Sequence, residues 1–245
     1  TRKMLPLSDG LILVSLICLA ACASMMIHYI VAGPGPGTFD LNIFPENTAI
    51  GEKVWARALL QMLYAAKLFG LTSLTFIKLS LLAFFHTLFS VSDTFRWCNW
   101  ITAIICITWF VLLLFLNIFV CRPIHIMWDT IGSTDHCMSR GRLWLGMELT
   151  NLLLDVIILC LPLSMLKALP LTVSQKFHVA CIFLLGGLAC ITSMVKLAYI
   201  WVPSDHHLVR NTETCLWSLI QLGVATLCAC LPTYAPLFRL AQRKV

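Results

Sequence analysis

Charged side chains are scarce in this chain: only 11% of its 245 residues are Asp, Glu, Lys or Arg, whereas 60% are apolar. A soluble domain carries about 25% charged residues, so this chain lacks the charge needed to cover a surface that faces water. The composition therefore predicts a surface covered by membrane lipid. The formal net charge of +6 does not indicate a nucleic-acid-binding protein, because the basic residues lie at the ends of apolar runs and not in one patch.

Metal-binding and redox motifs are also missing. The twelve cysteines include no CxxC pair, so neither a structural zinc site nor a thioredoxin-like site is indicated. Most of these cysteines lie singly inside apolar runs, where they act as small apolar side chains. Four histidines of the predicted outer loops could bind a metal with Asp205, but their spacing matches no recognised ligand pattern, so we expect them to be solvated and expect no metal or cofactor. These histidines are His125, His136, His206 and His207.

Long apolar runs dominate the chain. Six of them, 11–32, 57–89, 97–121, 143–168, 176–202 and 212–240, each exceed the roughly 20 residues that a helix needs to cross a bilayer. The first is too long for the apolar core of a cleavable signal peptide. The second could be divided at Gly70, but no loop-forming residues flank that glycine, so we predict one long helix that tilts or projects beyond the lipid. The sequence predicts an all-α, multi-span transmembrane bundle with six helices in this chain.

Basic residues are distributed unequally between the two ends of these predicted helices. By the positive-inside rule, the end with more of them, which includes the C-terminus, faces the cytoplasm. The choice between plasma membrane and endomembrane stays open. One end carries Arg2, Lys3, Arg96, Lys167, Lys176, Arg239, Arg243 and Lys244, and the other carries Lys53, Arg57, Arg122, Arg140, Arg142 and Arg210.

The segment between the third and fourth runs contains two cysteines in polar surroundings, Cys121 and Cys137. In the predicted orientation both face an oxidising compartment, which favours a disulfide between them. The alternative is two free thiols at the membrane interface.

Four short motifs follow one another along the chain: KLS at 78–80, FVCRPIHIMW at 119–128 with a later cysteine, NLLLDVIILCLP at 151–162 and CACLP at 228–232. Their order and spacing resemble the fungal rhodopsin-like integral membrane domain family, which includes CFEM-bearing receptor-like proteins and a satratoxin-cluster membrane protein. The resemblance covers nearly the whole chain. It implies that residues 1–245 form a single domain with helices two to seven of a seven-helix parent. Two positions depart from the family pattern: His86 stands near an expected Tyr-x-Arg, and Gln221 stands where a glutamate is common.

Ionisable residues occur within the predicted spans, where each costs about 2.5–3.5 kcal/mol or more and is usually paired. Lys78 and Asp155 fall near mid-membrane, while Glu148 and Lys196 fall nearer one surface, so we predict two ion pairs at two depths. A lone Lys78 acting as a base or Schiff-base partner is the alternative. The buried polar residues predicted to line a ligand cavity are Lys78, Asn151, Lys196 and Gln221.

Two functions remain open at this point. The resemblance implies ligand sensing, or an accessory role linked to fungal secondary metabolite biosynthesis. Its expected partners are a small-molecule ligand and a cytoplasmic signalling protein whose identity the sequence does not give. The alternative is an intramembrane cyclase or isomerase in which Asp155 and Glu148 act as acid or base. Retinal binding is not expected, because residues 214–238 of the last apolar run include no lysine to attach it. Transport is less favoured, since no internal repeat or broken helix is evident.

Overall fold

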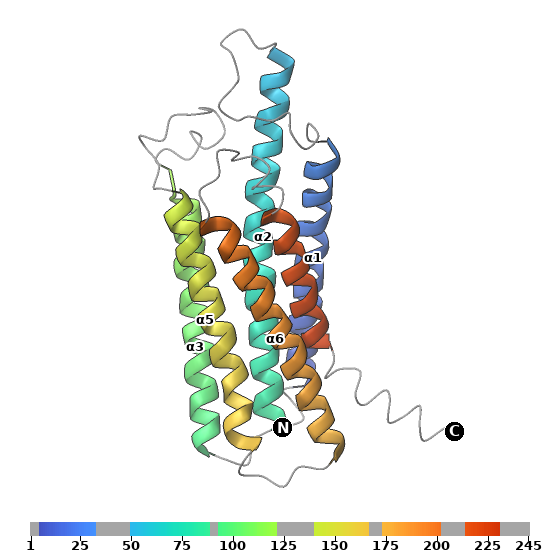
Figure 1. The fold of residues 1–245 in the computed structure, drawn as a ribbon, viewed down its shortest axis with the longest axis vertical. Coiled ribbons are helices and arrows are strands. Elements are labelled where there is room, and N and C mark those ends of the chain that lie inside the picture. Colours follow the sequence, from blue (N-terminus) through green and yellow to red (C-terminus); the bar gives the residue numbers. More distant parts are fainter. Residues whose placement is uncertain are drawn as a thin grey trace, which may run out of the picture.

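The computed structural model describes residues 5–32, 50–88, 93–121, 140–166, 173–201 and 214–230. These residues form six helices, so the predicted all-α class is confirmed. Five are labelled in Figure 1: α1 (Leu5–Ala32), α2 (Ile50–Leu88), α3 (Asp93–Ile118), α5 (Arg140–Leu166) and α6 (Val173–Trp201). The sixth, Thr214–Cys230, is called the last helix below.

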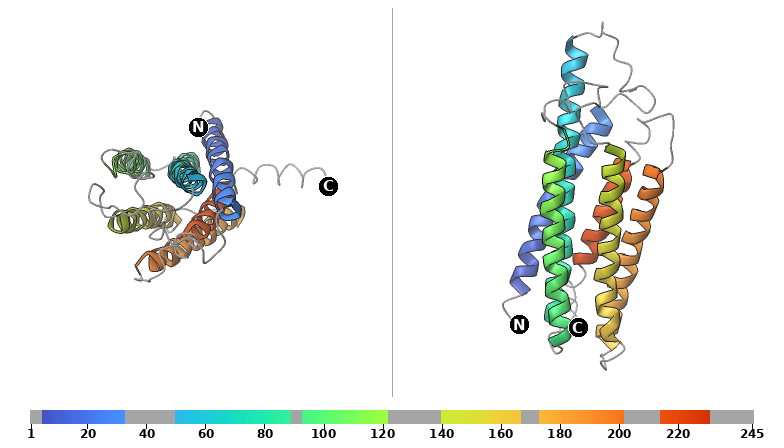
Figure 2. Two further views of the ribbon diagram at one scale, coloured as in Figure 1. Left: turned by 90° about the horizontal axis from the view of Figure 1, so that it is seen from above. Right: turned by 90° about the vertical axis from the view of Figure 1, so that its left-hand side faces the viewer.

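The helices form one bundle in which successive helices run in opposite directions (Figure 1). Helix α2 contacts α1, α3 and α5, and α5 also contacts α3 and α6. Seen from above, α2 lies between α1 and α3, while α5, α6 and the last helix close the other side (Figure 2). Side chains from α2, α5 and the last helix line a shared cavity inside the bundle.

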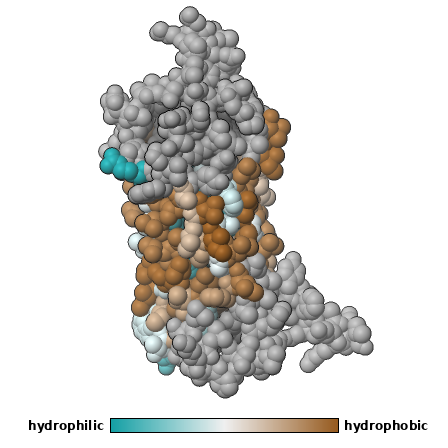
Figure 3. All heavy atoms as spheres, in the orientation of Figure 1, coloured by the Kyte–Doolittle hydropathy of each residue, from teal (hydrophilic) through white to brown (hydrophobic). Residues whose placement is uncertain are grey.

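Apolar side chains cover the outside of this bundle. Ile17, Leu112 and Leu184 are 70%, 56% and 72% exposed, and Figure 3 shows an apolar band around the middle with hydrophilic residues toward the ends. Four helices contain stretches long and apolar enough to cross a membrane: Ser8–His28, Leu60–Thr87, Asp93–Ile118 and Arg142–Pro162. Shorter apolar helical stretches occupy Gly186–Ala198 and Thr214–Cys230. The chain is therefore a multi-pass membrane protein.

Helix α2 continues without a break through Gly70, as the sequence predicted. It has 39 residues, roughly 60 Å at 1.5 Å per residue, which exceeds the thickness of a bilayer core. Its first turns project beyond the neighbouring helices (Figure 1). The helix starts at residue 50, before the predicted boundary of 57. The prediction missed these turns because they carry charged residues and so do not belong to the apolar run, although they are helical.

Small residues form the seam between α1 and α2. Ser8, Ser15 and Cys22 recur every seven residues on α1, and Ser73 and Ser80 have the same spacing on α2; all are buried. The Ser73 hydroxyl donates to the Ser15 carbonyl oxygen at 2.9 Å, and the Ser80 hydroxyl donates to that of Ser8 at 3.1 Å. Small side chains let two helix backbones approach closely, and in lipid such packing and hydrogen bonds hold helices together.

Candidate functional site

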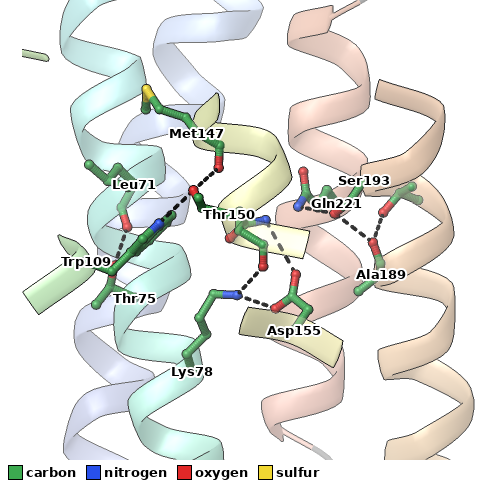
Figure 4. Close-up of polar contacts among 12 residues, drawn as sticks. Leu71, Thr75, Lys78, Trp109, Met147, Thr150, Asp155, Ala189, Ser193 and Gln221 are labelled. Atoms are coloured by element: carbon green, nitrogen blue, oxygen red, sulfur yellow. Dashed lines mark hydrogen bonds and ion pairs between the residues drawn. The ribbon is translucent and has the colours of Figure 1, made fainter. Parts of the chain in front are cut away.

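The first predicted ion pair lies between α2 and α5. The Lys78 ammonium donates to Oδ1 of Asp155 and, at 3.4 Å, to the backbone oxygen of Asn151 (Figure 4). The amide of Asn151 donates to the second carboxylate oxygen of Asp155, also at 3.4 Å. The Lys78 side chain is only 4% exposed. Lys78 is therefore one half of a buried pair, and the alternative of a lone catalytic lysine is wrong.

The second predicted ion pair joins α5 to α6, where Lys196 donates to Oε1 of Glu148. The side chains are 10% and 14% exposed, respectively. Glu148 precedes Asp155 by seven residues, so the two pairs are separated by roughly 10 Å along α5. Both pairs are thus present at two depths, as the sequence predicted.

A cavity of about 140 Å³ lies inside the bundle beside the Glu148–Lys196 pair. We call it the large cavity. All six described helices contribute to its lining, which is mainly apolar; Met26, Leu71 and Leu222 are examples. Small-molecule sites in proteins have this character, with apolar walls and a few polar groups that orient the ligand.

A cation–π contact forms part of the wall of the large cavity. The Lys67 ammonium lies over the Trp144 ring, 3.5 Å from its centroid, and both residues line the cavity. Such contacts contribute about 0.5–2 kcal/mol, depending on how far the cation is desolvated. Trp144 is the second residue of the predicted run 143–168, a position that predicts a tryptophan at the membrane interface. The sequence does contain a sign of its position at the cavity: Glu148 and Asn151 follow Trp144 by four and seven residues, so all three lie on one face of the helix.

Two amide side chains, Asn151 and Gln221, also line the large cavity. They are 3% and 1% exposed. Gln221 donates its amide hydrogen to the Ser193 hydroxyl oxygen at 2.6 Å, joining the last helix to α6 (Figure 4). The sequence identified both residues as buried and polar, but their hydrogen-bond partners depend on packing between helices far apart in the chain.

Three buried acceptor atoms of cavity-lining residues have no hydrogen-bond partner within the described residues: Oε2 of Glu148, Oδ1 of Asn151 and Oε1 of Gln221. An unsatisfied buried acceptor costs about 1–3 kcal/mol, so native proteins rarely keep several together. Nothing in the sequence indicates this feature, because it depends on which way each side chain is turned.

A small cavity of about 40 Å³ lies next to the large one and is lined by Lys78 and Asp155. Leu74 and Gln221 line both cavities and so form part of the wall between them. Of the predicted cavity residues, Asn151, Lys196 and Gln221 therefore reach the large cavity, together with Glu148, while Lys78 lines only the small one.

Other predicted positions fall partly outside the described residues. Cys121 is buried at the end of α3, whereas Cys137 lies outside, so the disulfide stays a prediction. The four loop histidines also lie outside the described ranges. Within those ranges, no group of three His, Cys, Asp or Glu side chains is placed to hold a metal ion.

Similar proteins come from fungi. The chain is 29% identical over 160 residues to Satratoxin biosynthesis SC1 cluster protein 4 of Stachybotrys chartarum, which covers 65% of this chain and 58% of that protein. It is 33% identical over 159 residues to Wortmanamides biosynthesis cluster protein C of Talaromyces wortmannii, covering 64% of this chain and 43% of the relative. The chain thus spans about half the length of these relatives. A SAT4 family membrane protein of Emericella nidulans is 28% identical over 125 residues, covering 51% of this chain and 31% of that protein.

No solved structure matches the chain. The sequence model of the fungal rhodopsin domain matches residues 1–240. Because this match covers almost all of the sequence, the chain belongs to the fungal rhodopsin domain family.

Proposed function

We propose that this membrane protein binds a small, largely apolar compound in its large cavity, and that it senses this compound or assists a pathway of fungal secondary metabolism. The observation that carries the proposal is the large cavity itself. Every described helix contributes to it, its walls are apolar, and charged and amide groups lie among them. The link to secondary metabolism is supported by relatives named for satratoxin, wortmanamide and polyenoic acid gene clusters.

The two buried carboxylates favour binding over catalysis. Asp155 and Glu148 each accept a hydrogen bond from a lysine on a neighbouring helix. Ionisable residues paired in this way within a span commonly fix the packing of the helices that carry them. A general acid or base must also have an oxygen available to the substrate, and both oxygens of Asp155 are already hydrogen-bonded.

One observation favours the enzyme alternative in a narrower form. Oε2 of Glu148 has no partner within the described residues, and Glu148 lines the large cavity. Such an oxygen could accept a proton from a bound substrate during an isomerisation or cyclisation. Both oxygens of Asp155 are already hydrogen-bonded, so Glu148 is the candidate base and Asp155 is a positioning residue in this alternative.

The proposed function is tested by metabolite profiles of a deletion strain of the producing fungus, restored with the intact gene or with variants. Ser218 lines the large cavity, and Ser218→Phe would fill much of it, whereas Ser218→Ala is the matched control. We expect Ser218→Ala to restore normal metabolite levels and Ser218→Phe to fail at equal abundance in the membrane. Full restoration by Ser218→Phe would contradict a role for the cavity.

A Glu148→Gln strain separates the two candidate functions. If one pathway intermediate accumulates in this strain while the protein remains folded, the enzyme alternative replaces the sensing role. Sensing or an accessory role instead predicts lower levels of all products without an accumulating intermediate.

We also propose that the C-terminus is cytoplasmic and that Cys121 and Cys137 form a disulfide at the opposite side. The excess of basic residues at the C-terminal side supports the orientation, and the burial of Cys121 at the end of α3 suits a bridged cysteine. Both are tested with a membrane-impermeant maleimide applied to intact cells. Labelling of Cys137 in Cys121→Ser but not in the unchanged protein is expected; labelling in both would contradict the bridge.

A further inference from the structure

We propose that the compound in the large cavity is neutral and carries a hydroxyl or amide N–H group that donates to the side-chain oxygen of Asn151 or Gln221. This inference rests on the proposed function and names the class of ligand. It starts from the buried oxygens of Glu148, Asn151 and Gln221, which have no partner within the described residues although these residues line the cavity. A ligand with hydrogen-bond donors supplies the missing partners.

The surrounding hydrogen bonds fix which way the two amides are turned. The NH₂ group of Asn151 faces Oδ2 of Asp155, and a carboxylate oxygen can only accept, so the amide nitrogen must lie on that side. The Ser193 hydroxyl donates to the Ala189 carbonyl oxygen at 3.1 Å, so its oxygen accepts from the amide nitrogen of Gln221 (Figure 4). In both residues the NH₂ group already donates a hydrogen bond, and the side-chain oxygen remains available as an acceptor. The two amides therefore select hydrogen-bond donors and not carbonyl or ether groups.

The charges nearby favour a neutral donor over an ammonium group. Lys67 and Lys196 both line the large cavity, and the Lys67 ammonium lies over the Trp144 ring. Glu148, the acid among the described residues that line this cavity, is already paired with Lys196. A cationic ligand would therefore meet two ammonium groups, and charges of like sign at close range repel.

The shape of the lining indicates an apolar body for the rest of the ligand. Trp109 and Trp144 both line the cavity, and the indole N–H of Trp109 is already donated to the Thr150 hydroxyl at 3.0 Å. From Trp144 to Asn151 the cavity wall extends roughly 10 Å along α5. A flat hydrocarbon body with a hydroxyl group at one end fits this arrangement of indoles and amides.

The test uses tritiated 2-naphthol as the probe, bound to the purified protein in detergent at pH 7, where naphthol is uncharged. Unlabelled 2-naphthol, 2-methoxynaphthalene and 2-naphthylmethylamine compete with it. The methyl ether has the same ring but no donor, and the amine has a donor and a positive charge. We expect 2-naphthol to compete about tenfold better than either analogue.

Variants assign the preference to particular oxygens. The double variant Asn151→Leu with Gln221→Leu removes both amide acceptors and should bring the ether within about twofold of naphthol, while Gln221→Glu keeps an acceptor and should retain the preference. Thr108→Ala, at an exposed residue outside the cavity lining whose hydroxyl donates to the Ile104 carbonyl oxygen, should also retain it. A single gel-filtration peak shows that each variant is folded.

The outcomes separate this inference from the proposed function. Saturable binding of naphthol and its ether with equal affinity would overturn the donor requirement but leave the cavity as a binding site. A preference that survives in the folded double variant Asn151→Leu with Gln221→Leu would overturn the assignment to the amide oxygens. The absence of saturable binding by any probe would contradict the cavity as a binding site and the inference with it.

Discussion

Two ion pairs inside the bundle join the same chemical groups but differ in how completely the carboxylate is bound. Asp155 uses one oxygen for Lys78 and the other for Asn151. Glu148 uses one oxygen for Lys196, and its second oxygen has no partner within the described residues. The first pair is a closed network that holds α2 to α5. The second is an incomplete network at the wall of the large cavity. A carboxylate oxygen without a partner at such a wall can accept a hydrogen bond from a ligand.

The largest effect should come from breaking the closed pair. Asp155→Asn leaves the Lys78 ammonium, 4% exposed, without its counter-charge, and removing one partner of a buried pair costs about 3–5 kcal/mol. We expect a large drop in the melting temperature measured by fluorescence-detected gel filtration. Exchanging the two residues, Lys78→Asp with Asp155→Lys, should recover part of the loss. If the exchange is no better than the single change, the pair does not stabilise the bundle.

A smaller loss of stability should follow from Glu148→Gln. Lys196 lies within five residues of the end of α6 at Trp201, so its long side chain can move its ammonium toward the membrane surface when the partner is lost. We expect a cost of about 1–2 kcal/mol, measured by the same melting experiment. A loss equal to that of Asp155→Asn would show that the two pairs have the same structural role.

The cation–π contact at the cavity should contribute less again. Trp144→Leu removes the ring over which Lys67 lies, and Lys67→Met removes the cation. A double-mutant cycle should give a coupling of about 0.5–2 kcal/mol, reported as melting temperatures of the two single variants and the double variant. A coupling of zero would mean that the contact does not stabilise this part of the bundle.

The smallest effect is expected at the exposed pair of Arg96 and Asp93 at the start of α3. Their side chains are 50% and 90% exposed, and the nitrogen and oxygen are 3.2 Å apart. Exposed pairs contribute little because water and salt screen them. Asp93→Asn should leave the melting temperature unchanged within error, which makes it the reference for Asp155→Asn. If Asp93→Asn lowered the melting temperature as much as Asp155→Asn, burial would not explain why the inner pair stabilises the protein more than the exposed one.

The sequence was sufficient for the helices and for both ion pairs. Apolar runs longer than a bilayer thickness define the spans, and a charge inside a span has so few favourable partners that Lys78 with Asp155, and Glu148 with Lys196, follow from depth alone. The start of α2 was less predictable, because its first turns carry charged residues and form a helix before the apolar run begins.

A ligand cavity with buried polar residues was predicted, but its volume and full lining could not be. Its volume depends on how side chains from six helices pack, and the unpartnered oxygens depend on the orientation of individual amides. Trp144 shows the limit clearly: its place near the end of a predicted span indicates the membrane interface, whereas the Lys67 ammonium holds it at the cavity wall.

The central claim, that the large cavity holds a compound, is tested most directly by native mass spectrometry of the protein purified from the producing fungus. The account predicts a bound neutral compound with at least one hydroxyl or amide N–H group, present with the unchanged protein and Ser218→Ala and absent with Ser218→Phe. The same compound bound equally to Ser218→Phe, or no compound bound to any folded form, would contradict it.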